Sequence, residues 1–184
     1  MMSVKVDATN VLAMLQKLQE KASNMTPVLS YIGERIRSSV LQNFEVGGRW
    51  SGTVGDWHGG GKKWAPLSQG RKAFKQSVGN DSKTLQFNGN LRNSISPVIT
   101  DNQVEIGTNV AYAAIHQFGA TKGPFQIKPK NKKALFWPGA RHPVAIVNHP
   151  GFTIPARPFL VVQDTDIAAI TAKIASYLSI TATP

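Results

Sequence analysis

The chain has 184 residues, 41% of them hydrophobic, and a formal net charge of +11. This length suits one domain with a hydrophobic core, spanning residues 1–184, rather than two domains. The absence of cysteine excludes disulfides, thiolate nucleophiles and cysteine-based metal centres. No apolar run reaches the roughly 20 residues of a membrane span, and the N-terminus lacks the pattern of a secretory signal. We therefore expect a soluble protein that is made in a cytoplasm and contacts no membrane.

The positive charge is concentrated in the middle of the chain. Between Lys62 and Arg157 the only acidic residues are Asp81, Asp101 and Glu105. The basic clusters of the same region are Lys62–Lys63, Arg71 with Lys72 and Lys75, and Lys128 with Lys130, Lys132 and Lys133. A surface with this charge attracts polyanions or acidic protein faces.

Two helices are predicted to open the domain, over about residues 7–45. Their apolar residues recur at helical spacing, with Val11, Leu12, Leu15 and Leu18 in the first helix and Leu29, Ile32, Ile36, Val40 and Phe44 in the second. Thr26 is the predicted N-cap of the second helix, because Pro27 suits the first helical position. Gly47 and Gly48 are expected to end it.

A glycine-rich segment follows at about residues 46–63, and we expect it to be a long, mobile loop. Trp50 and Trp57 lie in this loop, and Trp64 lies directly after it. Large aromatic side chains in such a loop either contact a partner or fold back as lids on the core. The sequence leaves both alternatives open.

Residues 64–160 are expected to contain the sheet and several short helices. The basic, polar residues 71–83 form either a short helix or a second loop. Residues 84–95 are predicted to turn into a short helix whose Leu91 and Ile95 face inward.

A hairpin is predicted next, because apolar and polar residues alternate on both sides of a two-residue turn. Its strands are Ser96–Thr100 and Gln103–Gly107. Val104 and Ile106 define the buried face of the returning strand.

The stretch Gly107–Ala120 is predicted to comprise a strand end, a short helix and a stop. Asn109 is the expected cap of this helix, and Gly119 is expected to end it in a left-handed conformation. In a second stretch, Ile154–Leu160, a proline on either side of Arg157 holds the backbone extended. This arginine is therefore presented from a stiff segment.

Further strands are expected at Phe125–Ile127, Ala134–Trp137 and Pro143–Val147. The last element is a helix over about residues 163–178, capped by Asp164 or Thr165. Together the elements predict an α+β fold, in which a central antiparallel sheet lies between N-terminal helices and a C-terminal helix.

The sequence shows no recognisable catalytic constellation. The histidines His58, His116, His142 and His149 lack the spacing of metal ligands, which disfavours a zinc site. Asp164 and Asp166 lie at a helix start, where they complement the positive helix end. We therefore expect no enzymatic activity, no metal and no cofactor.

Nucleic-acid binding is the main alternative, because lysines and arginines accompany tryptophans that offer stacking surfaces. However, no recognition motif appears, and the charge falls in loops rather than along one helix face. Basic loops can equally dock on the acidic face of a protein ring. Composition does not separate these two interpretations.

Several short motifs occur together in one order along the chain. They are Trp64–Leu67 with Arg71–Lys72, Leu85 with Gly89–Leu91 and Ser94–Ile95, Val104–Thr108, Tyr112–Ala113 with His116–Gly119, and Ile154–Leu160 before the terminal helix. With these motifs, over about residues 25–178, the chain resembles the phage virion morphogenesis family, the tail-completion and neck proteins of Mu-like contractile-tailed phages. The glycine–tryptophan loop and residues 128–149 depart from the family pattern.

The resemblance implies a non-enzymatic virion protein that completes the tail or joins it to the head. It implies an oligomeric ring, expected to be a hexamer, in contact with tail-tube, terminator or connector proteins and around a channel for DNA. The protein would be made in the host cytoplasm and reside in the neck or tail of the virion. The alternative is a basic DNA-binding protein that acts outside the particle.

Two groups of residues are expected at contacts with other molecules. Contacts with identical or neighbouring subunits are expected at Trp50, Trp57, Trp64, Tyr112, His116, Arg157 and Phe159. Contacts with DNA or an acidic ring are expected at Lys62, Lys63, Arg71, Lys72, Lys130, Lys132 and Lys133. Arg157 is expected either to pair with an acidic patch of a neighbour or to hold an ordinary core or turn position. An ordinary core or turn position is also the alternative for Tyr112 and Phe118.

Overall fold

The computed structural model describes residues 8–49, 63–80, 83–100, 102–137 and 141–179. Its helices are α1 (Thr9–Ser23), α2 (Thr26–Val46), α3 (Gln69–Ser77), α4 (Asn90–Asn93), α5 (Ala113–Phe118) and α6 (Asp164–Leu178). Its strands are β1 (Ser96–Thr100), β2 (Gln103–Gly107), β3 (Ala120–Lys122), β4 (Phe125–Ile127), β5 (Val147–His149) and β6 (Phe152–Ile154). The expected α+β class is confirmed. Most of the glycine-rich loop, with Trp50 and Trp57, lies outside the described residues.

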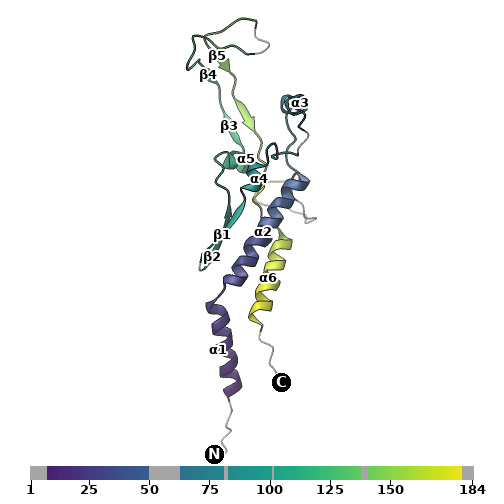
Figure 1. Ribbon diagram of the computed structural model, residues 1–184, viewed down its shortest axis with the longest axis vertical. Coiled ribbons are helices and arrows are strands. Elements are labelled where there is room, and N and C mark those ends of the chain that lie inside the picture. The colour runs from purple at the N-terminus through teal and green to yellow at the C-terminus, as the bar shows by residue number, and fades with distance from the viewer. Residues whose placement is uncertain (1–7, 50–62, 81–82, 101, 138–140, 180–184) are drawn as a thin grey trace, which may run out of the picture.

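The molecule is elongated. Figure 1 shows α1 at one end and the β4–β5 ladder at the other, with α2, α6 and the β1–β2 hairpin between them. The expected central sheet is divided, because the described strands form three two-stranded antiparallel sheets, β1–β2, β3–β6 and β4–β5. The last two follow one another as a projecting arm (Figure 1), which we call the β arm.

The predicted hairpin is confirmed, with Ser96 opposite Gly107 and Thr100 opposite Gln103. It packs on α2 at Gly33, where a Cβ atom would lie 2.9 Å from Cβ of Pro97. A larger residue at this position would force the helix and the hairpin apart.

The β arm differs most from the predicted strands. β4 is confirmed at its predicted residues. Residues 134–137 and 143–147 were expected to be strands, but they share only an isolated bridge between Leu135 and Val144. Neither β3 nor β6 was predicted.

Two helix starts differ from the predicted ones. α2 begins at Thr26 itself, whose N–H donates to the side chain of Asn24 at 3.3 Å. α5 begins after Tyr112 rather than after Asn109, and its first turn carries no side-chain cap. The sequence left open whether residues 71–83 form a short helix or a second loop. The structure has a helix here, α3, over residues 69–77, and the side chain of Ser68 caps it.

The hydrophobic core joins the middle elements. Its buried members are Val40, Phe44, Trp64, Leu91, Ile95, Ala113 and Phe159. The ring of Phe44 lies 5.4 Å from the rings of both Trp64 and Phe159, centroid to centroid. The indole N–H of Trp64 donates to the carbonyl of Pro158 at 2.8 Å, and the amide of Asn43 donates to the carbonyl of Phe159 at 3.1 Å. Of the two alternatives for the tryptophans, Trp64 therefore folds back on the chain and is part of the core.

A buried polar network joins α2 to α6. The carboxylate of Asp166 accepts hydrogen bonds from Arg35 Nε at 2.9 Å and from Ser39 Oγ at 2.6 Å. The side chain of Gln163 donates to Ser39 Oγ at 3.0 Å, and its backbone N–H donates to Asp166 at 3.1 Å. Gln163, rather than Asp164 or Thr165, thus caps α6 in a capping box with Asp166. Asp166 does more than complement the helix end, since it fixes α6 against α2.

Replacing Asp166 with alanine should lower the free energy of unfolding by about 3 kcal/mol, because Arg35 and Ser39 lose their common acceptor. The matched control is Thr165→Ala, an exposed change in the same helical turn, which should stay within about 0.5 kcal/mol of the wild type. Chemical denaturation followed by circular dichroism measures both. Equal stability of the two variants would contradict the role given to this network.

Candidate partner-binding groove

The two stretches that stood out in the sequence, Gly107–Ala120 and Ile154–Leu160, lie against each other. The side-chain oxygen of Gln117 accepts hydrogen bonds from the backbone N–H groups of Phe159 and Leu160, both at 3.0 Å. Its side-chain nitrogen donates to the carbonyl of Leu160 at 3.1 Å. One amide therefore holds both residues by their backbone.

The contact continues toward the β arm. The N–H of Arg157 donates to the carbonyl of His116 at 2.7 Å. Gly119 follows with φ +75°, and a Cβ atom there would lie 2.8 Å from the carbonyl oxygen of Ile154 and 2.9 Å from the nitrogen of Ala156. Glycine is therefore required for the backbone conformation and for the close approach. As predicted, φ is positive at this stop, although ψ of 175° lies outside the left-handed helical region.

Arg157 is buried, and its guanidinium donates to two backbone carbonyls, those of Ala65 at 2.8 Å and Pro66 at 3.0 Å. Burial lowers the pKa of this group. Of the two alternatives for Arg157, the ordinary position inside the chain fits these contacts, because its partners are carbonyls of its own chain. Its charge is held inside the subunit, where it orients the segment before α3.

His116 lies beside this charge. Its Nδ1 atom is buried and has no hydrogen-bond partner among the described residues. Burial, and secondarily the charge of Arg157, lower the pKa of His116. The ring packs edge to face with Tyr112 at 5.7 Å between centroids. Tyr112 is 46% exposed and Phe118 78% exposed, so the core alternative is wrong for both of these residues.

A groove with a volume of about 740 Å³ lies next to His116, between α3 and the residues that precede Arg157. We call it the α3 groove. Its apolar lining includes Leu67, Leu85, Phe87, Tyr112 and Ile154. The volume lies in the range of sites that bind small molecules or a few side chains.

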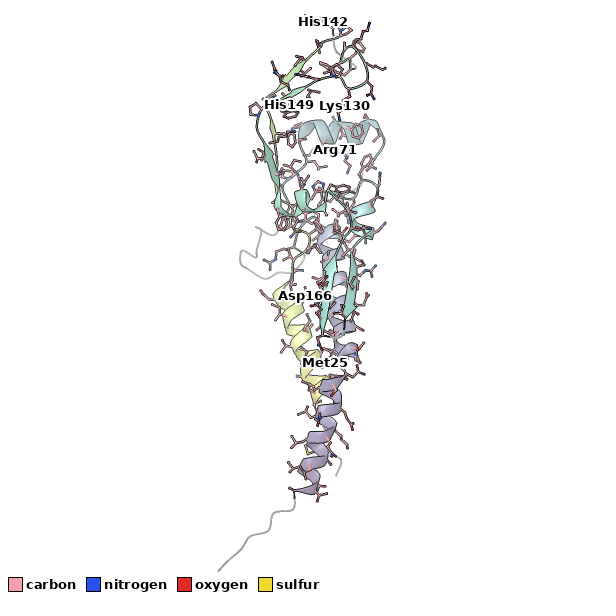
Figure 2. All side chains as sticks on the ribbon, turned by 90° about the vertical axis from the view of Figure 1, so that its left-hand side faces the viewer. Met25, Arg71, Lys130, His142, His149 and Asp166 are labelled. Carbon is pink, nitrogen blue, oxygen red and sulfur yellow. The ribbon has the colours of Figure 1, made fainter. Side chains whose placement is uncertain are left out.

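The charged residues that line the α3 groove, among those described, are Arg71, Lys75, Lys83 and Arg157, all of them basic, and His116 lies beside them. The Arg71 guanidinium lies over the rings of Phe74 and Phe87, at 5.1 and 4.9 Å from their centroids. Lys83 pairs with Glu45 at 2.9 Å, and this contact lowers the pKa of that carboxylate. Figure 2 shows Arg71 on α3, nearer than Asp166 to the end of the molecule where His142 lies.

The structure separates the residues expected at subunit contacts. Trp64, Arg157 and Phe159 are buried within the chain and contact its own atoms, which corrects the expectation that they face a neighbour. Tyr112 and His116 line the α3 groove and stay candidates for a contact. Trp50 and Trp57 lie outside the described residues.

The basic residues also lie in different places. Arg71 lines the α3 groove, whereas Lys72, on the same helix, is exposed and does not. Lys63 is exposed and donates to the carbonyl of Val46 at 3.2 Å. Lys130, Lys132 and Lys133 are exposed beyond β4, in the β arm. Lys62 lies outside the described residues.

Sequence reasoning missed Gln117 and the groove-lining Lys75. The available signal for Gln117 was a long polar side chain inside a short, mostly apolar helix. For Lys75 the mostly polar residues 69–77 gave no apolar face that would predict an inward position, although the residue is buried.

Within the described ranges, no cluster of histidine and acidic residues could hold a metal ion. The helices in those ranges also lack the length and apolar composition that a membrane crossing requires.

Comparisons with known proteins cover nearly the whole chain. The model of the phage virion morphogenesis family matches residues 6–179. The chain belongs to this family. It is 28% identical, over 174 residues, to the Mu-like prophage FluMu G protein 2 of Haemophilus influenzae, covering 95% of this chain and 93% of that protein. It is also 30% identical over 77 residues to an uncharacterized protein of Methanocaldococcus jannaschii, covering 40% of this chain and 57% of the other. No solved structure matches the chain.

The family match includes every helix and strand of the described fold, from α1 to α6. The α3 groove and the exposed α1 are therefore parts of the unit that the family model covers. A role in virion morphogenesis follows from this membership.

Gln117→Ala should lower the free energy of unfolding by about 2 to 3 kcal/mol, because three backbone groups at Phe159 and Leu160 lose their partner. Gln126→Ala, an exposed change in β4, is the control and should alter stability by less than about 0.5 kcal/mol. Urea unfolding monitored by tryptophan fluorescence gives both values. An unfolding free energy for Gln117→Ala as high as that of the control would contradict the assigned role.

The lowered pKa of His116 predicts a loss of stability on acidification. The unfolded chain binds a proton at the ordinary pKa of 6.5, whereas the folded chain does so only at lower pH. The contribution of His116 is therefore complete above that pH and decreases below it. His116→Gln should flatten the change in unfolding free energy between about pH 7 and pH 5. An NMR titration that gives His116 an ordinary or raised pKa would overturn this prediction.

Proposed function

We propose that this protein is a structural component of the phage neck or the head-proximal end of the tail, where it forms an oligomeric ring. The ring completes the tail, joins it to the head, or does both. A hexamer that matches the sixfold symmetry of the tail is the proposed state. The partners are tail-tube, terminator or connector proteins of the same virion.

One observation carries the proposal that the chain assembles with its own copies: α1 has no buried residue. Its apolar stripe stays open, with Val11, Leu12, Met14, Leu15 and Leu18 between 37% and 59% exposed. A helix of 15 residues is marginal in water without packing on its apolar face. We therefore expect the apolar stripe of α1 to pack on a neighbouring subunit.

The connection of α1 to the rest of the chain supports this view. The Lys21 ammonium group donates to the carbonyl of Ser179 at 2.8 Å, and the Tyr177 hydroxyl donates to the carbonyl of Asn24 at 2.6 Å. Both hydrogen bonds lie at the junction with α2, so they fix one end of α1 and leave its stripe free. Figure 1 shows the helix extending beyond the ends of α2 and α6.

The distribution of charge fits a ring around DNA or between acidic protein layers. The chain has 21 lysines and arginines against 10 acidic residues. Lys130, Lys132 and Lys133 are exposed in the segment that follows β4, and Figure 2 shows Lys130 toward the end of the molecule where His142 lies. Loops of this kind lower the repulsion of DNA in a channel or dock on an acidic surface. We propose a structural role without catalysis, in the virion after synthesis in the host cytoplasm.

The location is tested by mass spectrometry of purified virions, combined with a map of the junction between head and tail in which the chain is placed. The expected result is several copies in a ring at that junction. An intact virion that lacks the chain would overturn the proposal. A monomer in solution would not, because such a ring can form only on the assembling tail.

The role of α1 is tested by a matched pair of variants. Leu15→Glu places a charge in the apolar stripe, whereas Ala13→Glu places the same charge on the opposite face of the helix. In phage that depend on a supplied copy of the protein, Leu15→Glu should lower incorporation into particles at least about tenfold, and Ala13→Glu should leave it unchanged, because a buried unpaired charge opposes the contact. Equal incorporation of the two variants would contradict an α1 interface.

DNA binding outside the particle stays the alternative function, and the net charge favours it. A titration with duplex DNA at about 50 mM salt tests it, because phosphate contacts are strongest at low salt. Absence of affinity under these conditions removes the alternative.

A further inference from the structure

We propose that the α3 groove binds an extended segment of another virion protein, one that places a carboxylate beside an aliphatic or aromatic side chain. The proposed function supplies only the source of this partner. The binding chemistry follows from the groove itself, from its free arginine, its apolar lining and its rigid wall.

Arg71 is the residue that meets the carboxylate. Its guanidinium is exposed, and it forms no hydrogen bond and no ion pair with the described residues. Its contacts with the rings of Phe74 and Phe87 restrict the side chain before a ligand arrives. A planar guanidinium that is held in this way fits a carboxylate through two parallel hydrogen bonds.

The rest of the groove adds positive charge. Lys83, in the lining, shares the carboxylate of Glu45 with Arg92, at 2.9 and 2.8 Å. Among the described residues that line the groove there is no aspartate or glutamate. An acidic group that enters the groove therefore meets positive charge, and at Arg71 it displaces no ion pair with the described residues.

The apolar part of the ligand is expected to contact Leu67, Tyr112, Ile154 and Pro155, which line the groove. These side chains offer a surface for one or two aliphatic or aromatic groups. A phosphate backbone would satisfy the charge and leave this surface uncovered. The lining thus favours a protein segment over nucleic acid.

The wall formed by residues 83–91 is held by the core, which keeps the groove open without a ligand. The Gln86 amide donates to the carbonyl of Phe44 at 2.6 Å, and the Asn80 amide donates to the carbonyl of Phe87 at 3.1 Å. A preformed site loses less ordering entropy on binding. A short segment can therefore bind it without folding a loop first.

The test uses the full chain and two probe peptides, acetyl-Glu-Phe-Glu-Leu-amide and its uncharged analogue acetyl-Gln-Phe-Gln-Leu-amide. Binding is followed by NMR chemical-shift changes. The acidic peptide should shift residues of the α3 groove in a saturable manner. The uncharged peptide should bind at least about fivefold more weakly, because it lacks the charge that Arg71 recognises. This comparison leaves the protein unaltered.

Variants of α3 supply the second arm of the test. Arg71→Glu should weaken the acidic peptide at least about tenfold, whereas Lys72→Glu, with the same change of charge on the neighbouring exposed residue, should alter binding less than about twofold. Arg71→Lys, which keeps the charge and loses the planar group, should fall between them.

The proposal is overturned by absence of shifts in the groove, by equal binding of the two peptides, or by equal losses in the Arg71 and Lys72 variants. Groove shifts caused by short duplex DNA in preference to the acidic peptide would assign the site to nucleic acid instead. Shifts that grow with protein concentration alone would assign it to a second copy. Failure of this test leaves the location in the virion standing, since that is measured on particles.

Discussion

The amide of Gln117 forms three hydrogen bonds with the backbone at Phe159 and Leu160, and the arrangement of the middle of the molecule depends on them. They hold Phe159 where its ring meets Phe44, and they set the direction from which Arg157 enters the chain between Trp64 and α3. The groove beside α3 takes its shape from the same contact. A single neutral side chain thus connects the core to the surface at which we expect a partner.

The two ends of the molecule differ from this middle. The buried network of Arg35, Ser39, Gln163 and Asp166 fixes α6 on α2 in one position, because hydrogen bonds require matched partners where methyl groups do not. Beyond it, α1 and the β arm have few buried residues. A rigid centre that carries open ends is suited to a component whose ends are completed by other subunits.

Sequence patterns predicted the elements that are long or strictly alternating: the first two helices, the terminal helix and the β1–β2 hairpin. They failed where the structure depends on contacts between distant segments. In the β arm, β4 was predicted, whereas β3 and β6, also of three residues, were missed. The caps of α2 and α6 were placed one or two residues too late. For the site, the sequence singled out the two stretches around His116 and Arg157, but it did not predict which atoms the side chains of these stretches contact. Arg157 contacts backbone carbonyls that lie 91 and 92 residues away, and no local pattern reports such a partner.

The shortness of the strands in the β arm has a consequence for the protein before assembly. Every described strand there pairs on one edge and leaves the other unpaired. Exposed edges invite other chains to add strands and aggregate. Strands of three residues, with Lys122 at the end of β3, offer too few backbone groups in a row for such additions. The shortness of these strands therefore limits edge-to-edge association of the free protein.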